Sequence, residues 1–284
     1  MVHKMRQVSV SELPEPFFSA IKIDAVLEFV SGCHSETQNF QTPVQSLDGK
    51  CFICSKDVTF GVYMSADGAP VNWRETLSCP ECGLINRWRG CLHVFEAVGE
   101  PTGEDRIYLT ETLSPVYENL ASRFPLLTAS EYFPDSELGS MVETHHTKVR
   151  NEDATQLTFA DQSFEFVLCF DVLEHVPDYQ QALREFCRIL AAGGQLVLSV
   201  PFNFRHATQI RAVQDDHGTI THLMEPCYHG DPLSSGGVLS YRDFGMDLLE
   251  EMQAAGFQEC FVVCYNTRKW GYLENNIVFV GRKG

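Results

Sequence analysis

The sequence predicts an α/β protein, with helices on both faces of a largely parallel sheet and a small cysteine-rich segment before it. Two observations support this prediction. Between about residues 105 and 284, short apolar runs alternate with amphipathic runs, and the apolar runs lack the polar alternation of half-exposed strands. Between residues 46 and 95, two Cys-x2-Cys pairs occur in a stretch too small to build a core of its own.

The composition narrows the class of protein. The chain has 284 residues, 44% hydrophobic and 21% charged, which suits one large folded domain or two unequal ones. A formal net charge of −17 disfavours nucleic-acid backbones and anionic membranes as partners. No apolar run approaches the roughly 18 residues of a membrane span, and residues 1–18 lack the apolar core of a signal peptide. We therefore expect a cytoplasmic protein whose 11 cysteines are metal ligands or buried thiols.

Residues 1–45 are expected to form an N-terminal helical leader. Within residues 17–30, Ile21, Ala25 and Phe29 share one apolar stripe with the spacing of an amphipathic helix. We expect this helix to pack on its own domain, with a lid or a homodimer contact as the alternatives.

The two cysteine pairs predict a structural zinc site in a zinc-ribbon-like segment, residues 46–95. Two residues separate Cys51 from Cys54, and the same spacing separates Cys79 from Cys82. Two such turns can present four thiolates to one tetrahedral Zn²⁺, and this closed set of ligands leaves no open position for catalysis. The alternatives are four buried apolar cysteines or a redox-active pair.

A short basic stretch, residues 86–90, follows the second cysteine pair. Arg87, Trp88 and Arg89 can anchor the segment on the acidic main domain or form a small nucleic-acid patch. The net charge favours the anchor.

The expected elements of the sheet have local signals of their own. Ser114 suits a helix N-cap and Pro115 the first helical position. Gly193 or Gly194 suits the left-handed end of a helix. The expected strands are 106–110, 164–170, 195–200, 257–265 and 275–283, and the expected helices are 114–124, 178–190 and 241–255.

Acidic residues lie at the ends of successive expected strands. They are Glu111, Glu131, Asp153 and Asp171. Each one alone suits a solvated loop. Because ligands of open parallel sheets bind beyond the carboxyl ends of the strands, the four together indicate a crevice that accepts hydroxyls, amines or a cation.

Residues 151–201 resemble the central part of class I S-adenosylmethionine-dependent methyltransferases. The order matches: an acidic–alanine step, an Asp-x-Ser-Phe turn, an apolar strand, "VLEHV", a helix, a Gly-Gly turn and another strand. The resemblance implies a Rossmann-like, seven-stranded methyltransferase domain over residues 105–284. Residues 72–90 and 108–111 also resemble a zinc-bearing subset often associated with modification of sugars or natural products.

The resemblance implies S-adenosylmethionine as cofactor and assigns residues to it. Glu131 would hold the ribose hydroxyls, and Asp153 would face the adenine amino group with Ala154 beside the ring. Phe170 and Asp171 would line the pocket near the methionine part.

The loop after the first strand departs from the family pattern. The family usually has glycines there, where the backbone passes close to the cofactor, but this chain has "LTETLSPVYENL". Glu111 matches the acidic residue that opens the loop, and Thr112 and Ser114 can supply hydroxyl contacts.

The long segment 202–242 is the expected acceptor lid. Methyl transfer to a hydroxyl needs a base, and histidine is the natural one near neutral pH. The candidates are His229 first, then His222 and His175. Alternatively, His222, Glu225 and His229 are ligands of a second metal ion.

The leading functional interpretation is a methyltransferase acting on a small molecule or a sugar-containing metabolite, at oxygen. The loop without glycines motivates a second interpretation, a degenerate domain that binds a ligand or partner or catalyses a rearrangement. A zinc-containing RNA methyltransferase is the third, and the acidity of the chain weighs against it.

Overall fold

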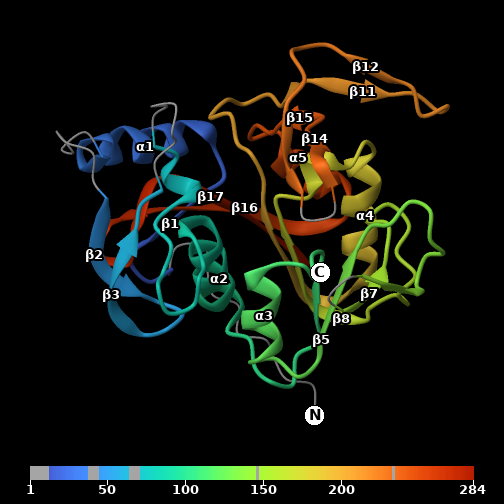
Figure 1. The fold of residues 1–284 in the computed structure, drawn as a ribbon. Coiled ribbons are helices and arrows are strands. Elements are labelled where there is room, and N and C mark those ends of the chain that lie inside the picture. The colour runs from blue at the N-terminus through green and yellow to red at the C-terminus, as the bar shows by residue number, and fades with distance from the viewer. Residues whose placement is uncertain (1–12, 38–44, 64–70, 145–146, 232–233) are drawn as a thin grey trace.

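A large sheet forms the centre of the molecule, with the strand order β1-β16-β17-β9-β8-β4-β5-β7-β6 (Figure 1). The computed structural model describes residues 13–37, 45–63, 71–144, 147–231 and 234–284. The strands from β7 to β9 are parallel, and the remaining strands join them antiparallel. The strand bounds are β1 (Phe17–Ala20), β4 (Ile107–Leu109), β5 (Leu127–Glu131), β6 (Met141–Glu143), β7 (Lys148–Asn151), β8 (Phe164–Phe170), β9 (Leu190–Ser199), β16 (Phe257–Thr267) and β17 (Tyr272–Lys283).

The neighbouring strands from β7 to β16 give the Rossmann-like sheet expected from the sequence, so the α/β fold class is confirmed. β16 and β17 pair antiparallel, as expected. β1 and β6 extend the two edges of this sheet, and neither strand was predicted.

The central strand β8 shows why its sequence is apolar from Phe166 to Phe170. Val167 and Cys169 point into one hydrophobic core, and Phe166, Leu168 and Phe170 point into the other. Because successive side chains of a strand face opposite sides, a strand covered on both faces needs apolar residues at every position.

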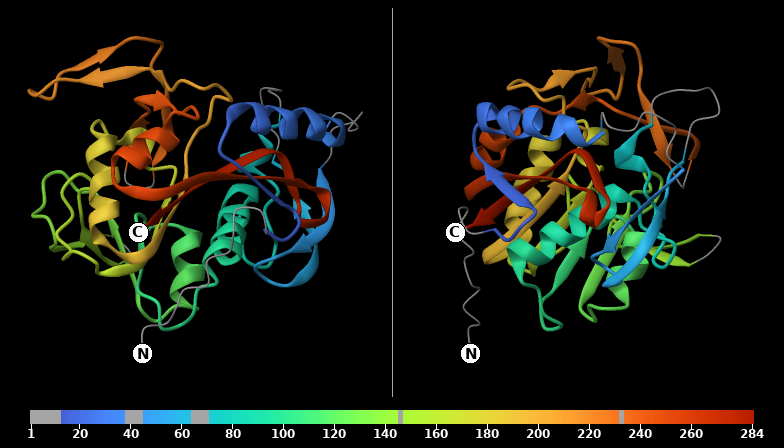
Figure 2. Two further views of the ribbon diagram at one scale, coloured as in Figure 1. Left: turned by 180° about the vertical axis from the view of Figure 1, so that it is seen from behind. Right: turned by 90° about the vertical axis from the view of Figure 1, so that its left-hand side faces the viewer.

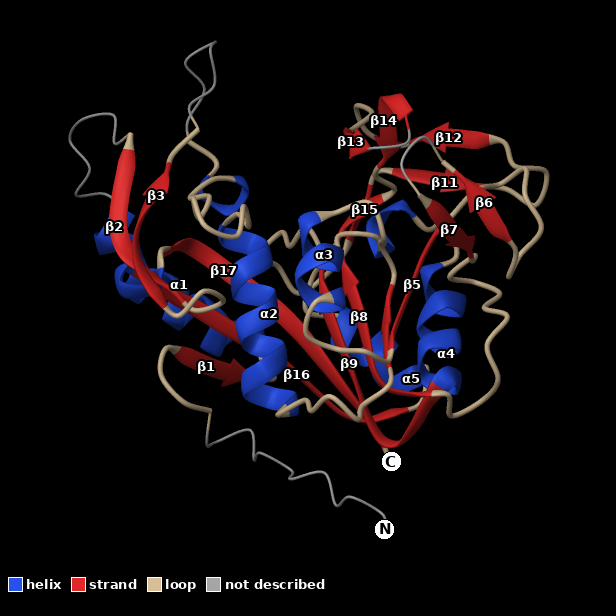
Figure 3. Ribbon diagram, turned by 60° about the horizontal axis from the view of Figure 1, so that its bottom comes forward, coloured by secondary structure: helices blue, strands red, loops and turns tan. Residues whose placement is uncertain are grey.

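Helices cover both faces of the sheet (Figures 2 and 3). Val26, Leu183 and Met252, from α1, α4 and α5, belong to one core, whereas Phe95 and Val116, from α2 and α3, belong to the other. The helices are α1 (Ile23–Thr37), α2 (Asn86–Gly99), α3 (Pro115–Ala121), α4 (Tyr179–Ile189) and α5 (Leu248–Ala254), with short 3-10 turns η1 (Trp73–Glu75), η2 (Leu173–His175) and η3 (Arg268–Trp270). None of the helices in the described part of the chain combines the length and hydrophobicity that crossing a bilayer requires.

The N-terminal leader differs from its prediction. Residues 17–20 form strand β1, which pairs antiparallel with β16, instead of the first turn of a helix. The helix α1 then begins at Ile23 and packs on the sheet through Val26 and Val30. Residues 1–12 and 38–44 of the leader lie outside the described residues.

Three other boundaries differ from expectation. The helix expected over 241–255 begins only at Leu248, and Arg242–Asp243 form a short strand before it. α2 crosses the expected end of the cysteine-rich segment at residue 95 and joins it to the main sheet. α4 ends at Ile189, and Gly193 adopts its left-handed conformation (φ +77°) within β9 rather than at the helix end.

Short strands build the cysteine-rich segment and the expected lid. β2 (Ser46–Cys51) and β3 (Lys56–Gly61) form a hairpin that carries the first cysteine pair. The lid consists of paired strands rather than irregular chain, and its β11–β12 hairpin projects from the body in both Figure 1 and Figure 2. The lid strands are β10 (Gln209–Ile210), β11 (Ala212–Gln214), β12 (Ile220–His222), β13 (Tyr228–Asp231), β14 (Ser234–Leu239) and β15 (Arg242–Asp243).

Candidate functional site

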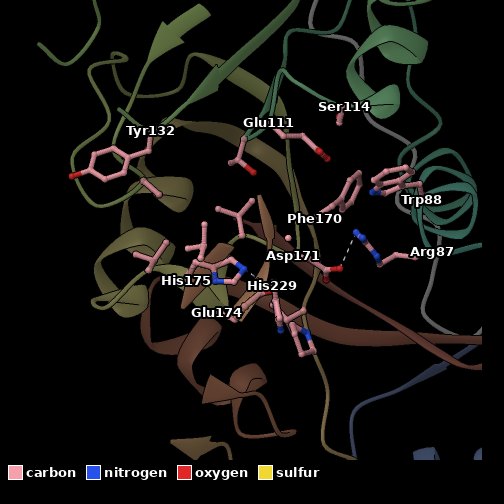
Figure 4. A pocket seen from close by; sticks show the side chains of 18 of the residues that line it. Arg87, Trp88, Glu111, Ser114, Tyr132, Phe170, Asp171, Glu174, His175 and His229 are labelled. Atoms are coloured by element: carbon pink, nitrogen blue, oxygen red, sulfur yellow. Dashed lines mark ion pairs between the residues drawn. The ribbon is translucent and has the colours of Figure 1, made fainter. Parts of the chain in front are cut away.

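A cavity of about 1500 Å³ lies at the carboxyl ends of the parallel strands. Glu111 lines it after β4, Glu131 at the end of β5, Asp153 after β7 and Asp171 after β8. The four acidic strand ends expected to share a crevice therefore do so. His229 of the lid also lines this cavity (Figure 4).

The loop after β4 is held by a carboxylate instead of being shaped by glycines. Glu131 Oε1 accepts hydrogen bonds from the backbone N–H groups of Thr112, at 2.7 Å, and Leu113, at 2.8 Å. Ser114 then caps α3, its hydroxyl accepting from the N–H of Tyr117 at 3.3 Å. Within the described chain the buried hydroxyl of Thr112 has no hydrogen-bond partner. Thr112 is buried and is not one of the residues that line the cavity.

The carboxyl group of Glu111, in this loop, is buried and holds its proton more strongly than an exposed carboxyl does. Burial raises the pKa of Glu111 to about 7, although the Ser114 hydroxyl and Arg87 act in the opposite direction. No described residue gives a hydrogen bond to its buried Oε1 atom. At neutral pH, the carboxyl group of Glu111 is therefore protonated and neutral in a substantial fraction of the molecules.

Asp153 and Ala154 form a turn beside the cavity. The Oδ1 atom of Asp153 accepts hydrogen bonds from the N–H of Thr155, at 2.8 Å, and from its hydroxyl, at 2.7 Å. The turn fixes the carboxylate while Ala154, next to it, lines the cavity with a small side chain. Tyr132, half exposed on the same side, is a lining residue that the sequence reasoning missed.

Asp171 lies between two arginines of the cysteine-rich half of the chain. Its carboxylate is 2.6 Å from Arg74 Nη2 and 2.8 Å from Arg87 Nη1, and it accepts from the Ser199 hydroxyl at 3.0 Å. Burial alone would raise the pKa of Asp171, but the two guanidinium groups outweigh it and hold the pKa well below its usual range. Asp171 also has a left-handed backbone, with φ +53°.

Residues 72–88 therefore supply one wall of the cavity. Arg74, Arg87 and Trp88 line it opposite the histidines, as Figure 4 shows for Arg87 and Trp88. The sequence reasoning treated Arg87 as an anchor and did not connect it with Asp171. In the sequence, the only indication of this contact was a pair of basic residues in an acidic chain.

Arg89 fastens the cysteine-rich segment to the sheet. Its side chain is fully buried, and its guanidinium donates to the carbonyls of Leu77, at 2.9 Å, and Gly271, at 3.0 Å. It also stacks over the Phe60 ring of β3 at 4.0 Å. Arg87 and Arg89 thus both point inward rather than toward an external partner.

The four cysteines come together as their spacing indicated. The Sγ atoms of Cys51 and Cys82 are 3.9 Å apart, as are those of Cys54 and Cys79, and all four lie within 4.8 Å of one another. Four sulfurs at about 2.3 Å from one Zn²⁺ in a tetrahedron would be about 3.8 Å apart. Gly83, at φ +72°, turns the chain immediately after the second pair. The geometry fits a closed four-thiolate metal site.

The candidate histidines separate into two groups. His229 and His175 lie against the buried carboxylate of Glu174, with N···O distances of 3.5 and 3.6 Å. Glu174 raises the pKa of His229. His222 and Glu225 are exposed on or beside β12, away from the lining of the cavity. The sequence reasoning singled out His175 in "VLEHV" but assigned no role to the neighbouring Glu174.

Comparison with known proteins adds a sequence match within this domain. Residues 113–198 match the family described as "Methyltransferase domain". The chain is 43% identical over 54 residues to a demethylmenaquinone methyltransferase of Listeria welshimeri and 42% identical over 52 residues to one of Halalkalibacterium halodurans. These segments are 19% and 18% of this chain, and the chain spans only 23% and 21% of those relatives.

Solved structures with a similar arrangement include two methyltransferases. An S-adenosylmethionine-dependent methyltransferase from Mesorhizobium loti has a TM-score of 0.44 at 14% identity, over 71% of this chain and 100% of that one. The 1,6-didemethyltoxoflavin-N1-methyltransferase of Burkholderia thailandensis has a TM-score of 0.40 at 16% identity, over 69% and 77%. Residues 113–198 are therefore similar to a methyltransferase domain, and the strand order around them is that of an open, largely parallel α/β sheet.

Proposed function

We propose that the protein binds S-adenosylmethionine in the cavity and transfers its methyl group to an oxygen of a small molecule or sugar-containing metabolite. The observation that carries the proposal is the convergence of Glu131, Asp153 and Asp171 at the carboxyl ends of the parallel strands β5, β7 and β8. In an open parallel sheet this edge is where ligands bind.

The cofactor residues follow from the positions of these side chains. Asp153 and Ala154 would receive the adenine, and Glu131 the ribose hydroxyls. Glu111, Thr112 and the pair Phe170–Asp171 would surround the methionine part. The unpartnered Oε1 atom of Glu111 supports this placement, because buried polar atoms are normally hydrogen-bonded.

The chemistry divides between the cofactor and the chain. S-adenosylmethionine, when bound, supplies a methyl group activated by a sulfonium. The chain has to hold an acceptor oxygen in line with that methyl group and to help remove the hydroxyl proton. His229 first, and His175 beside it, are placed to do this, directly as bases or through an ion that they bind. His222, which was a further candidate, is exposed on β12.

We also propose that Cys51, Cys54, Cys79 and Cys82 bind a structural zinc ion. It would stabilise the segment that carries Arg74 and Arg87 into the cavity. Because all four positions around the ion are filled by thiolates, this zinc would take no part in methyl transfer.

The first test is calorimetric titration of the protein with S-adenosylmethionine and S-adenosylhomocysteine, after removal of any co-purified cofactor. We expect both to bind, and Asp153→Ala to weaken both. Asp57→Ala, at an exposed position on β3, is the matched control and should bind as the unchanged protein does. Absence of binding to the folded protein would refute the proposal and favour a ligand-binding or rearrangement function instead.

A further inference from the structure

We propose that Glu174, His175 and His229 form a second metal site, which holds a divalent cation in the acceptor part of the cavity. This site is separate from the four-cysteine cluster and uses nitrogen and oxygen ligands. It differs from the set His222, Glu225 and His229 considered from sequence, two members of which are exposed outside the cavity.

The carboxylate of Glu174 is buried and unsatisfied. Its side chain is 0% exposed, and neither of its oxygens accepts a hydrogen bond from the described chain. An ionised carboxylate buried without a partner is costly. The guanidinium of Arg242 does not satisfy it: Nη1 donates to the carbonyl of Val176, at 2.6 Å, and Nη2 to that of Pro177, at 2.8 Å, while the buried Nε has no hydrogen-bond partner among the described residues.

The distances between this carboxylate and the two imidazole rings leave room for an ion. Glu174 Oε1 is 3.5 Å from His229 Nδ1 and 3.6 Å from His175 Nε2, which is too long for good hydrogen bonds. Two ligand atoms that are each about 2.1 Å from one ion are about 3.4 Å apart in a tetrahedral arrangement. One ligand atom from each of the three residues lies within 4.8 Å of the others. The spacing therefore suits an ion between them.

The orientation of His175 directs a nitrogen lone pair toward Glu174. Its Nδ1 atom is 2.8 Å from the carbonyl oxygen of Leu239, and a carbonyl can only accept a hydrogen bond. Nδ1 therefore carries the proton, and in the neutral ring the lone pair is on Nε2, which faces Glu174. Metal-bound histidines usually donate their other N–H to a carbonyl or carboxylate in this way.

The third ligand ties the site to the lid. His229 is on β13 and pairs with Val238 of β14, and β14 ends at Leu239, the partner of His175. An ion bound here would join this hairpin to the 3-10 turn η2 that follows β8. The remaining positions around the ion would face the cavity, because all three ligands line it.

The ligand set indicates the class of ion. Two imidazole nitrogens and one carboxylate suit Mn²⁺, Fe²⁺, Co²⁺ or Zn²⁺ better than Mg²⁺ or Ca²⁺, which prefer all-oxygen sets. Thiolates prefer softer ions, so the two sites of the chain should differ in selectivity.

The role of the ion, unlike its binding, rests on the proposed methyl transfer. The acceptor class is a molecule with a hydroxyl beside a second oxygen, such as a vicinal diol, an enediol or an α-hydroxycarbonyl, which chelates the ion. A hydroxyl bound to the ion has a lowered pKa, and its proton leaves to solvent. The oxygen lone pair then forms the bond to the methyl carbon while the sulfur–carbon bond breaks. The electron pair of the broken sulfur–carbon bond stays on sulfur, which becomes the neutral thioether of S-adenosylhomocysteine.

The test measures Mn²⁺ binding directly and needs no turnover. Free Mn²⁺ is followed by electron paramagnetic resonance during titration of the full chain, with the metal already on the protein measured beforehand. We expect about one Mn²⁺ per chain, and at least about tenfold weaker binding in Glu174→Gln and His229→Gln. His175→Gln serves if one of these variants fails to fold.

The matched controls come from an exposed pair with the same residue types and spacing. His206 Nε2 is 3.7 Å from Glu250 Oε1, and both side chains are mostly exposed. Glu250→Gln and His206→Gln should leave Mn²⁺ binding unchanged. No Mn²⁺ binding by the folded protein, or equal losses in the control variants, would overturn the proposal. Mn²⁺ binding without any S-adenosylmethionine binding would support the metal site and refute the methyl transfer separately.

Discussion

Glu111 gives a prediction whose size follows from its surroundings. Burial raises the pKa of its carboxyl from 4.5 to about 7, and Glu131 and Asp171 add to the shift while Arg87 opposes it. Each pKa unit corresponds to about 1.4 kcal/mol. The folded chain therefore holds a proton that the unfolded chain releases, and roughly 3 kcal/mol of stability should be lost as pH rises from about 4.5 to about 7.

Glu111→Gln tests this reasoning because the amide has nearly the same shape but does not ionise. The sign is that of a carboxyl with a raised pKa: near pH 4.5 the side chain is neutral in the folded protein, as in the variant. Above about pH 7 the unchanged protein carries a buried charge that the variant lacks. We expect the variant to be as stable at pH 4.5 and more stable, by up to roughly 3 kcal/mol, at pH 8.

The assay is urea unfolding of both proteins at several values between pH 4.5 and pH 8.5. The difference between the two proteins isolates Glu111 from the other titrating groups. Glu118→Gln, at an exposed position on α3, is the control and should give a difference near zero at every pH. A difference between Glu111→Gln and the unchanged protein that does not vary with pH would show that the carboxyl is not held neutral in the folded state.

Three other outcomes are expected. Metal analysis should find about one zinc per chain bound to sulfur, and Cys79→Ser should lose it and unfold at lower temperature; a zinc-free, fully folded protein would contradict this. Arg87→Met should cost about 3 kcal/mol, because it leaves the buried Asp171 with one arginine. Lys56→Met, which breaks an exposed pair, should lower the unfolding temperature much less than Arg87→Met in the same thermal unfolding experiment. Asp153→Ala should weaken S-adenosylmethionine binding in calorimetry, and unchanged affinity would exclude Asp153 as a cofactor residue.

The sequence predicted elements well where the physical signal was local. β8 has the expected bounds because only Glu165 interrupts its apolar run, and α3 begins where Ser114 and Pro115 indicate. The strand β1 was missed because its pairing with β16 depends on residues at the other end of the chain. The lid strands were missed because they are short and largely exposed, so they carry no apolar periodicity.

The part of the site that lies at the ends of the strands was predicted from the sequence, and the part contributed by other segments was not. Glu111, Glu131, Asp153 and Asp171 follow buried runs, so their convergence could be inferred from the geometry of a parallel sheet. The pairing of Asp171 with Arg74 joins residues from two separate segments, and no spacing rule relates them.

The pairing of β1 with β16 has a consequence for synthesis of the chain. Phe17 pairs with Tyr265, so this strand emerges from the ribosome long before its partner exists. At roughly 5–20 residues per second, the delay is on the order of 10 to 50 seconds. During this interval β1 is an unpaired strand available to other nascent chains, and the exposed Phe18 is a residue that a chaperone could hold. Although β1 is made early, it is thus among the last of the described strands to pair with its neighbour.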